Sequence, residues 1–280
     1  MSSTFAAIDG KTRLLGVIGD PVHHTLSPGM HNLACADLGL NIRYLPLHVR
    51  PENLADAVKG LRAIGAMGFN ATIPHKEALL PLMDTLDPVA EMIGAVNTVV
   101  IGADGRLSGY NTDAYGFMTA LREVFSAPLE ELTVVVLGAG GAARGVLAGL
   151  SRLGAGRIFL ANRTWSKAVD LAERFNALPV PWDRLPLEGC GLLINTTSLG
   201  LGGTDVREVD LSRLPGSALV YDIVYSPPLT PLLAAARARG LKGENGLGML
   251  IHQGARAFEI WTGQKMPVAK VRSLLGGLAG

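Results

Sequence analysis

A glycine-rich turn gives the chain its clearest chemical signature. The β-branched segment Thr133–Leu137 runs into Gly138–Ala143, and a helical pattern over Arg144–Leu153 follows. This is the GxGxxA form of the dinucleotide-binding fingerprint in a strand–turn–helix setting, although a glycine-rich turn of some other α/β protein is the alternative. A tight turn, a backbone that a pyrophosphate can approach and a helix N-terminus together suit a dinucleotide. The residues predicted to bind it are Gly138, Ala139, Gly140, Gly141 and Ala142.

The end of the next predicted strand indicates which dinucleotide to expect. An NAD site usually has a carboxylate there, which binds the ribose 2′-hydroxyl. This chain instead has Asn162, Arg163 and Thr164, with Lys167 one helical turn further on. An arginine fork attracts a 2′-phosphate, whereas a carboxylate would repel it. The charge pattern therefore predicts NADP, the alternative being that Arg163 is an ordinary surface residue.

Two later turns are expected to border the nicotinamide ring. Asn195–Ser198 and Asp222–Tyr225 each follow a predicted strand. Ligands of open α/β sheets lie beyond the carboxyl ends of the strands. Thr196 and Ser198 are the predicted cofactor contacts of the first turn. Ordinary turn stabilisation by Asn, Thr and Ser side chains explains these residues equally well.

Hydride transfer to a carbonyl requires a proton donor, and Lys76 is the candidate. It ends the segment Gly68–Lys76 and is expected in the first turn of a short helix that begins at Pro74. The helix dipole disfavours a cation there, which points toward a functional role. His75 is a second possible acid, placed below Lys76 because nothing in the sequence orients its ring.

Three further polar residues are candidate partners of the proton donor or of a polar ligand. Asp113 and Ser27 each stand at the start of a predicted helix, so both are also explained as helix N-caps. Asn97 is expected inside an apolar strand over residues 96–101. A buried amide needs hydrogen-bond partners, which a polar ligand could supply.

Two α/β halves are needed to position these residues. Strands alternate with helices throughout, at 14–18, 42–49, 69–73 and 96–101 and again at 133–137, 157–161, 191–194 and 219–222. Such alternation predicts βαβ units and mostly parallel sheets. We expect an α/β protein of two domains with a cleft between them. A substrate-binding catalytic domain covers residues 1–112 and a Rossmann-type NADP-binding domain 113–245, while periodicity leaves the placement of a final helix at 247–263 open.

Composition narrows the class of protein. The 280 residues carry a net charge of +1 without a basic or acidic run, so neither nucleic acid nor a membrane surface is an expected partner. There are only two cysteines, and no HExxH or CxxC spacing indicates a metal site. No apolar run could span a bilayer, and no secretory signal begins the chain. We expect a cytoplasmic protein that binds a small-molecule substrate.

Taken in order, the motifs resemble those of the shikimate dehydrogenase family over nearly the whole chain. They are Gly19–Pro21, Leu26–Asn32, Phe69–Lys76, Gly94–Thr98, Asn111–Asp113, the Gly138 turn, Asn162–Thr164, Asp222–Tyr225 and Asn245–Leu250 with Gln253. The family reversibly reduces 3-dehydroshikimate to shikimate with NADPH, in aromatic amino acid biosynthesis. Its members are monomers and homodimers, and the sequence does not distinguish these states.

The resemblance implies roles for particular residues. Lys76 and Asp113 are similar to the family's catalytic pair, with Lys76 delivering or accepting the proton. The implied substrate contacts are Thr25, Ser27, Thr72, Asn97, Asp113, Tyr225 and Gln253. Asn162, Arg163 and Thr164 resemble the clamp on the 2′-phosphate, and Ile223 and Gly246 complete the expected cofactor contacts. The family also folds its C-terminal helices, here 246–280, onto the first domain.

One residue departs from the family pattern. Members usually have Ser-x-Ser-Pro where this chain has Thr25 and Ser27. Threonine keeps the hydroxyl but adds a methyl group that restricts χ1. The preference among shikimate, quinate and aminated analogues therefore stays open, and a paralogue acting on quinate or another shikimate-like acid is the nearest alternative. A non-catalytic NADP(H)-binding protein is a more distant one, and the presence of Lys76 and Asp113 argues against it.

Overall fold

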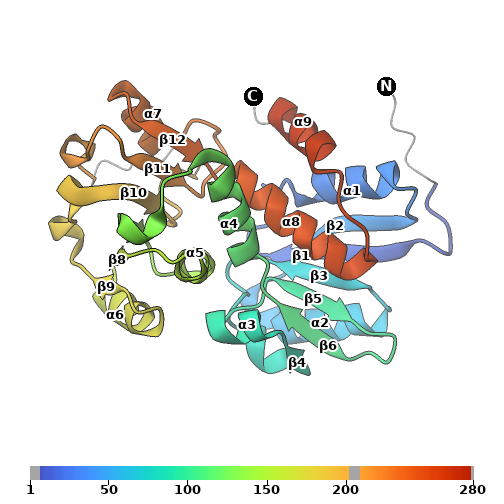
Figure 1. The fold of residues 1–280 in the computed structure, drawn as a ribbon. Coiled ribbons are helices and arrows are strands. Elements are labelled where there is room, and N and C mark those ends of the chain that lie inside the picture. The colour runs from blue at the N-terminus through green and yellow to red at the C-terminus, as the bar shows by residue number, and fades with distance from the viewer. Residues whose placement is uncertain (1–6, 202–208, 279–280) are drawn as a thin grey trace. The chain divides into compact units, whose positions relative to one another are not determined.

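The chain folds into two compact units. The computed structural model describes residues 7–201 and 209–278. The first unit comprises the chain up to Thr112 together with Ile251–Leu278, and the second comprises Asp113–Leu250. Each unit is a six-stranded sheet with helices packed against it (Figure 1). The chain thus passes from one unit to the other after Thr112 and again after Leu250.

A mostly parallel sheet of order β2-β1-β3-β5-β6-β4 forms the first unit. Its strands are β1 (Arg13–Gly19), β2 (Ile42–His48), β3 (Gly68–Ala71), β4 (Thr85–Leu86), β5 (Thr98–Ile101) and β6 (Leu107–Tyr110). The pairs β1–β2, β1–β3 and β4–β6 are parallel, whereas β3–β5 and β5–β6 are antiparallel. The β5–β6 hairpin is possible because Gly105, in the short connecting turn, adopts a φ of +78°.

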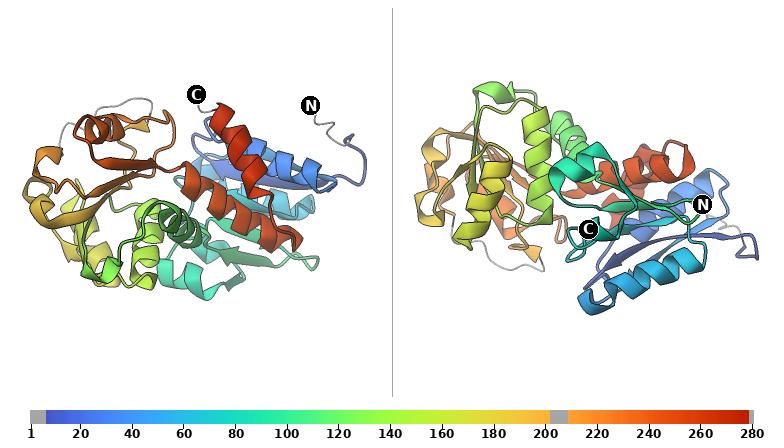
Figure 2. Two further views of the ribbon diagram at one scale, coloured as in Figure 1. Left: turned by 45° about the horizontal axis from the view of Figure 1, so that its top comes forward. Right: turned by 90° about the horizontal axis from the view of Figure 1, so that it is seen from below.

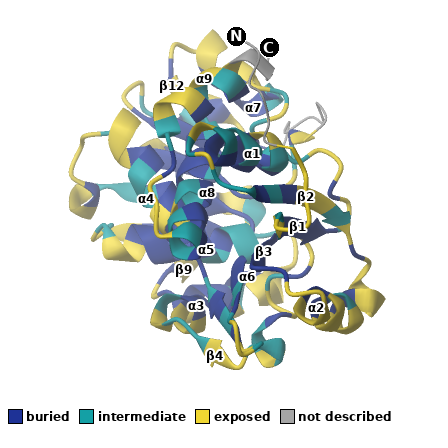
Figure 3. Cartoon of the chain, turned by 90° about the vertical axis from the view of Figure 1, so that its right-hand side faces the viewer, coloured by how far each residue is buried: buried dark blue, intermediate teal, exposed yellow. Residues whose placement is uncertain are grey.

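Helices cover both faces of this sheet. α1, α8 and α9 lie on one face and α2 lies on the other (Figures 1 and 2). The helices of the unit are α1 (Ser27–Asp37), α2 (Leu54–Ala63), α3 (Pro88–Ile93), α8 (Leu247–Thr262, from Ile251 onward) and α9 (Val268–Leu278). The central strands β1 and β3 are largely buried (Figure 3), and Ile18 and Phe69 are fully buried between the helical layers.

The second unit is an entirely parallel sheet of order β12-β11-β10-β7-β8-β9. Its strands are β7 (Thr133–Leu137), β8 (Arg157–Ala161), β9 (Leu178–Pro179), β10 (Cys190–Asn195), β11 (Leu219–Asp222) and β12 (Lys242–Asn245). Counted from β9, this is the 3-2-1-4-5-6 order of a Rossmann fold. The strand order reverses between β7 and β10, so the turns after these two strands lie at the point where such folds bind ligands.

The α-helices of the second unit, among its described residues, are α4 (Asp113–Val124), α5 (Gly141–Arg152), α6 (Trp165–Arg174) and α7 (Pro231–Ala238). α5 packs against α4, and α7 packs against β11 and β12. The close approach of α4 and α5 depends on glycine, because a Cβ at Gly145 would lie 2.6 Å from the Asp113 Cβ. At Gly149 it would lie 2.8 Å from the Phe117 ring.

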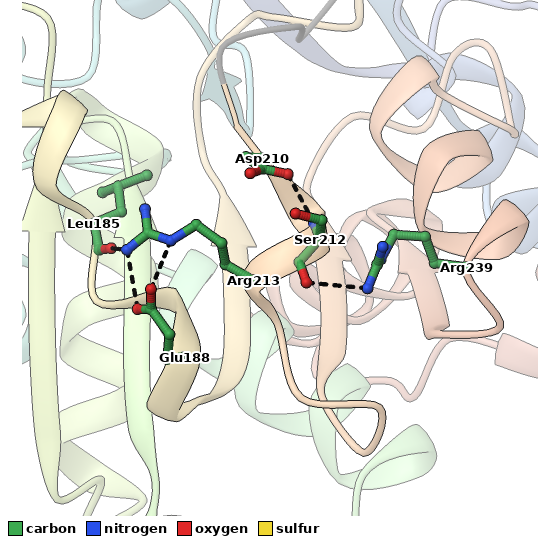
Figure 4. A network of polar contacts seen from close by, with 6 residues as sticks. All are labelled: Leu185, Glu188, Asp210, Ser212, Arg213 and Arg239. Carbon is green, nitrogen blue, oxygen red and sulfur yellow. Dashed lines mark hydrogen bonds and ion pairs between the residues drawn. The ribbon is translucent and has the colours of Figure 1, made fainter.

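A polar network on the surface of the second unit joins three of its short segments (Figure 4). Arg213 donates two hydrogen bonds, of 2.7 and 2.9 Å, to the Glu188 carboxylate and a third of 3.1 Å to the Leu185 carbonyl. Arg239 donates to the Ser212 carbonyl at 3.2 Å. Both ionised partners of the bidentate pair are well exposed, so solvent screens it and its contribution to stability is small.

The short helix expected from Pro74 does not form. Residues 73–79 are a series of turns, followed by a 3₁₀ helix at Leu80–Leu82. The reason is a long-range contact: the Lys76 carbonyl accepts a hydrogen bond of 2.8 Å from the Val96 N–H, so it is not available to an N–H one helical turn later. The helix-dipole argument for Lys76 is therefore wrong, and its role must rest on other observations.

Candidate active site

The Gly138 turn has the geometry of a phosphate cradle. Gly138 has a φ of +105°, and a Cβ there would lie 2.6 Å from Thr196 Oγ1, so a side chain is excluded. Its N–H donates to the Ala161 carbonyl at 2.7 Å, which joins the turn to the end of β8. Nothing lies within 4 Å of the position that a Gly140 Cβ would take. Open space over Gly140 and an α5 N-terminus without a side-chain cap fit a diphosphate, as expected for Gly138–Ala142.

The predicted 2′-phosphate residues lie at the end of β8, on the same edge of the sheet as the Gly138 turn. Asn162 donates to the Thr164 carbonyl at 2.9 Å and so shapes the turn. Arg163 and Lys167 are exposed, and neither forms an ion pair with any residue that the structure describes. Two unpaired cations beside a diphosphate cradle fit a cofactor that carries an additional phosphate.

The turns expected to border the nicotinamide follow β10 and β11, which are adjacent strands. The Thr196 N–H and Oγ1–H both donate to the Leu137 carbonyl, at 2.8 and 2.7 Å, which places Thr196 beside the Gly138 turn. Ser198 is exposed. A Cβ at Gly246 would lie 1.9 Å from the Ile223 carbonyl oxygen, so these two cofactor candidates are in contact and only glycine fits.

Asn97 is the centre of a polar cluster in the first unit. It lies in a bend just before β5, not inside the strand as expected, because the extended pairing begins at Thr98. Its Oδ1 accepts from the Thr112 N–H at 2.9 Å, and its Nδ2 donates to Thr112 Oγ1 at 3.0 Å and to Gln253 Oε1 at 3.4 Å. The structure thus brings together Asn97 and Gln253, two of the predicted substrate contacts.

Tyr44, Asn70 and Thr98 extend this cluster and were missed by the sequence analysis. Tyr44 donates to Asn70 Oδ1 at 2.7 Å, Asn70 Nδ2 donates to Thr98 Oγ1 at 3.0 Å, and Thr98 donates to Asn97 Oδ1 at 2.9 Å. All are buried. The one available signal was Asn70, a polar residue within the buried strand β3. Burial raises the pKa of Tyr44, so its hydroxyl remains a neutral donor.

Ser27 is not the helix N-cap that its position suggested. α1 begins at Ser27 itself, the N-cap residue is Leu26, and no side-chain hydrogen bond caps the helix. The Ser27 side chain instead lies close enough to Tyr44 to oppose the rise in the Tyr44 pKa, which places Ser27 beside the buried cluster. Thr25 Oγ1 accepts the Ser27 N–H at 3.2 Å. The capping explanation for Ser27 is therefore wrong.

The turn that carries Lys76 is held by its neighbour His75. His75 is almost fully buried, and its Nε2 lies 2.7 Å from the Val49 carbonyl oxygen. A carbonyl can only accept, so this nitrogen carries the proton and donates it. His75 is thus a structural donor, which argues against its role as a second acid. Thr72 lies in the same segment, with its methyl group 2.4 Å from where a Gly19 Cβ would be.

Asp113 is the first residue of α4 and is buried. The side chains of the preceding Asn111 and Thr112 bind Ala95 and Asn97. Gly145 of α5 fixes the position of Asp113 through the close contact described above. Asp113 and the half-buried Tyr225 belong to the second unit with the cofactor candidates, while Thr25, Ser27, Thr72, Lys76, Asn97 and Gln253 belong to the first.

Comparisons with known proteins agree on one family. Sequence models match at residues 17–99 (shikimate dehydrogenase substrate binding domain), 120–198 (shikimate / quinate 5-dehydrogenase) and 246–275 (shikimate 5′-dehydrogenase C-terminal domain). A shikimate dehydrogenase (NADP(+)) of Magnetococcus marinus is 54% identical over 98% of this chain and 99% of its own length. The chain belongs to the shikimate dehydrogenase family. The resemblance inferred from the motifs is confirmed.

Solved structures of the family share the fold. A shikimate 5-dehydrogenase from Thermus thermophilus, crystallised with NADP(H) and shikimate, is 38% identical over 93% of this chain and 97% of its own, with a TM-score of 0.85. A quinate dehydrogenase from Corynebacterium glutamicum, crystallised with NAD, is 31% identical over 95% of this chain and 99% of its own, with a TM-score of 0.87. The expected fold class, α/β with two mostly parallel sheets, is confirmed.

Two other kinds of feature are absent from the described residues. No three His, Cys, Asp or Glu side chains among residues 7–201 and 209–278 are grouped so that they could hold a metal ion. Within the same ranges, no helix has the length and apolar character needed to cross a membrane. The site candidates that remain are the two groups described above.

Proposed function

We propose that this protein is an NADP-dependent oxidoreductase that reversibly reduces 3-dehydroshikimate to shikimate. The observation that supports this best is the full-length match to a shikimate dehydrogenase at 54% identity, in a chain that keeps both the phosphate cradle and the polar cluster around Asn97. We place the reaction in aromatic amino acid biosynthesis, as in the family. A cytoplasmic location is supported by two buried cysteines that form no disulfide.

NADP is the proposed cofactor, and when bound it supplies or accepts the hydride. Gly138, Ala139, Gly140, Gly141 and Ala142 would hold its diphosphate at the N-terminus of α5. Asn162, Arg163, Thr164 and Lys167 would hold the 2′-phosphate, where the unpaired Arg163 offers a planar fork. Thr196, Ser198, Ile223 and Gly246 would line the nicotinamide end. This assignment is supported by the Rossmann strand order and by the position of the turns at 138, 162, 196, 223 and 246 directly after the ends of strands.

In the proposed mechanism, Lys76 and Asp113 form the catalytic pair. Lys76 gives a proton to the carbonyl oxygen during reduction and takes it back during oxidation, so the oxygen never carries an unstabilised negative charge. Asp113, Asn97 and Gln253 bind the ring hydroxyls. Thr25 and Ser27 bind the carboxylate, and Thr72 and Tyr225 complete the substrate contacts. Asn97 and Gln253 suit this role because their amides already converge within 3.4 Å.

Steady-state kinetics with shikimate and quinate, each with NADP⁺ and NAD⁺, test the proposal. We expect kcat/KM to be highest for shikimate with NADP⁺, by about two orders of magnitude over quinate and over NAD⁺. Quinate and NAD⁺ each differ from the preferred ligand in the polar groups that the site would bind, and such differences change kcat/KM strongly. A preference for quinate with NAD⁺ would contradict both the substrate and the cofactor.

A quinate-type specificity is the second candidate, and Thr25 is the observation that favours it. Thr25 Oγ1 already accepts the Ser27 N–H, so its hydroxyl proton is free to bind a carboxylate while its methyl group narrows the site. Thr25→Ser tests this directly. If Thr25 selects the substrate, the serine variant will change the ratio of kcat/KM for shikimate to that for quinate. If it does not, the ratio will stay the same within about twofold.

A further inference from the structure

A buried carboxylate in the second unit has no role in the site as described so far. Asp222, the last residue of β11, is fully buried and forms no ion pair with any residue that the structure describes. Burial raises its pKa, and hydrogen bonds from Thr230, Val224 and Asn195 counteract that rise. Burying a carboxylate without a cation is costly, so its position calls for an explanation beyond packing.

The carboxylate of Asp222 accepts hydrogen bonds from three separate segments. Oδ1 accepts from Asn195 Nδ2 at 2.9 Å, at the end of β10, and from the Val224 N–H at 3.1 Å, in the turn after β11. Oδ2 accepts from Thr230 Oγ1 at 2.6 Å, and Thr230 also caps α7 by accepting the Leu233 N–H at 3.3 Å. One side chain thus joins the ends of two adjacent strands to the start of a helix.

Asn195 passes this constraint on to the next turn. Its Oδ1 accepts from the Thr197 N–H at 3.0 Å and from Thr197 Oγ1 at 2.7 Å, and its Nδ2 donates to the Leu199 carbonyl at 3.1 Å. The Asn195 backbone carbonyl accepts the Ile223 N–H at 3.0 Å. The turns after β10 and β11, which hold the nicotinamide-end candidates Thr196, Ser198 and Ile223, therefore depend on Asp222 for their shape.

We propose that Asp222 is a positioning residue for the nicotinamide end of the cofactor: it fixes the turns at 195–199 and 222–225 in one geometry before the cofactor binds. This rests on the proposed function for the identity of the cofactor. A carboxylate suits the task because it accepts from several donors at once and presents no proton of its own to conflict with them. Among the described residues, no hydrogen bond joins Asp222 to the adenosine end at the Gly138 turn and Arg163; the Gly138 N–H donates instead to the Ala161 carbonyl.

Three variants distinguish a positioning role of Asp222 from a general contribution to the stability of the fold. Asp222→Leu leaves Asn195 Nδ2 and the Val224 N–H without the carboxylate as acceptor. Thr230→Val removes the donor to Oδ2 together with the cap of α7. Asp222→Asn keeps the Oδ1 acceptor and should retain most of the activity. Leu187→Ala, in the apolar core of the same unit, is the matched control for lost stability, because Leu187 is 1 % exposed and lies outside both turns.

The first readout is binding of 2′,5′-ADP, which reports only the adenosine end. We expect Asp222→Leu to bind it as the wild type does, within about twofold, while kcat falls by about tenfold or more and the isotope effect with 4-deuterated NADPH rises, because misplaced reacting atoms slow the hydride step. Thr230→Val should show a smaller fall. Arg163→Ala is expected to show the opposite pattern, with weakened binding of 2′,5′-ADP.

The second readout is hydrogen exchange of the cofactor-free protein, which requires no activity. Asp222→Leu should raise exchange in peptides covering 195–199 and 222–230 and leave the Gly138 turn and α5 unchanged. A parallel loss of 2′,5′-ADP binding, or faster exchange throughout the unit as in Leu187→Ala, would overturn the proposal, as would unchanged turnover in Asp222→Leu. A wild-type protein without activity would instead contradict the proposed function. The hydrogen-exchange and 2′,5′-ADP measurements would then still test whether Asp222 fixes the two turns.

Discussion

At the scale of single residues, Lys76 lies in a turn whose backbone is fixed from three sides. The His75 N–H donates to the Thr72 carbonyl at 2.9 Å, the Val96 N–H donates to the Lys76 carbonyl at 2.8 Å, and the His75 ring binds Val49. Such anchoring restricts the region from which the lysine side chain can extend. A general acid requires this, because proton transfer depends on the geometry of donor and acceptor.

Replacing Lys76 should therefore remove chemistry more than binding. We predict that Lys76→Ala lowers kcat by about 10²-fold or more with a modest change in KM, because the alkoxide formed by hydride transfer loses its proton donor. Steady-state and single-turnover kinetics measure both. The matched control is Lys59→Ala on α2, an exposed lysine whose ion pair within the described part of the chain is with Asp56. Unchanged turnover in Lys76→Ala would remove this residue from the mechanism.

Residue types and local spacing could indicate candidates for one part of the site and not for another. The Gly138 turn and Arg163 depend on contacts close in sequence to a strand end, so a motif could indicate them. Tyr44 and Asn70 bind each other across 26 positions, and no periodicity links them. The pattern around Ser27 is that of a helix cap, and only the structure, in which α1 begins at Ser27 and has no side-chain cap, rules that role out.

At the scale of elements, the contact between α4 and α5 sets the position of Asp113. We predict that Gly145→Ala lowers kcat/KM by about tenfold and destabilises the protein by about 1–3 kcal/mol, because the new Cβ would overlap with the Asp113 Cβ and α4 would have to move. Kinetics and urea denaturation of the purified variant measure the two effects.

Gly149→Ala is the matched control for overpacking in the same helix. Its Cβ would meet the Phe117 ring at 2.8 Å, one turn away from Asp113. We expect a comparable loss of stability with a much smaller loss of kcat/KM. Equal losses of kcat/KM in both variants would show that α5 affects activity through packing in general and not through Asp113.

Elements with strong local patterns were predicted well, and those that depend on distant partners were not. β7, β8 and β11 have the predicted bounds, since each contains an uninterrupted apolar stretch and is followed by a turn. The helix expected from Pro74 does not form because the Lys76 carbonyl accepts its hydrogen bond from the distant Val96 N–H. Strands β4 and β9 contain two residues each, too few for any period to show.

At the scale of the whole molecule, both sheets follow from the α/β alternation, but their order does not. The alternation predicted mostly parallel sheets, as found. The antiparallel pairing of β5 with β6 depends on the tight turn at Gly105, which forms a hairpin where a crossover helix would have given a parallel strand. The Rossmann order of the second sheet likewise emerges only when the strands are paired in space.

A buried histidine couples the stability of the molecule to pH. His31 on α1 is fully buried, its ring stacks on Tyr44 at a centroid distance of 4.2 Å, and neither ring nitrogen has a hydrogen-bond partner among the described residues. Burial lowers the pKa of His31 to about 3. The unfolded chain, with its ordinary pKa of about 6.5, therefore binds a proton more readily than the folded one.

Stability should accordingly fall as the pH falls through the unfolded pKa of His31. We predict that this residue alone accounts for a loss of about 2 kcal/mol between about pH 7.5 and about pH 5, because the folded state stays unprotonated over that range. Urea denaturation at the two pH values measures this loss of stability. Trp261 fluorescence, in a Trp165→Phe, Trp182→Phe background, reports unfolding around His31, because the two rings are 5.6 Å apart. His31→Leu should lose about 2 kcal/mol less than the parent over the same interval. Equal losses in the two proteins would mean that other groups, and not His31, set the acid sensitivity.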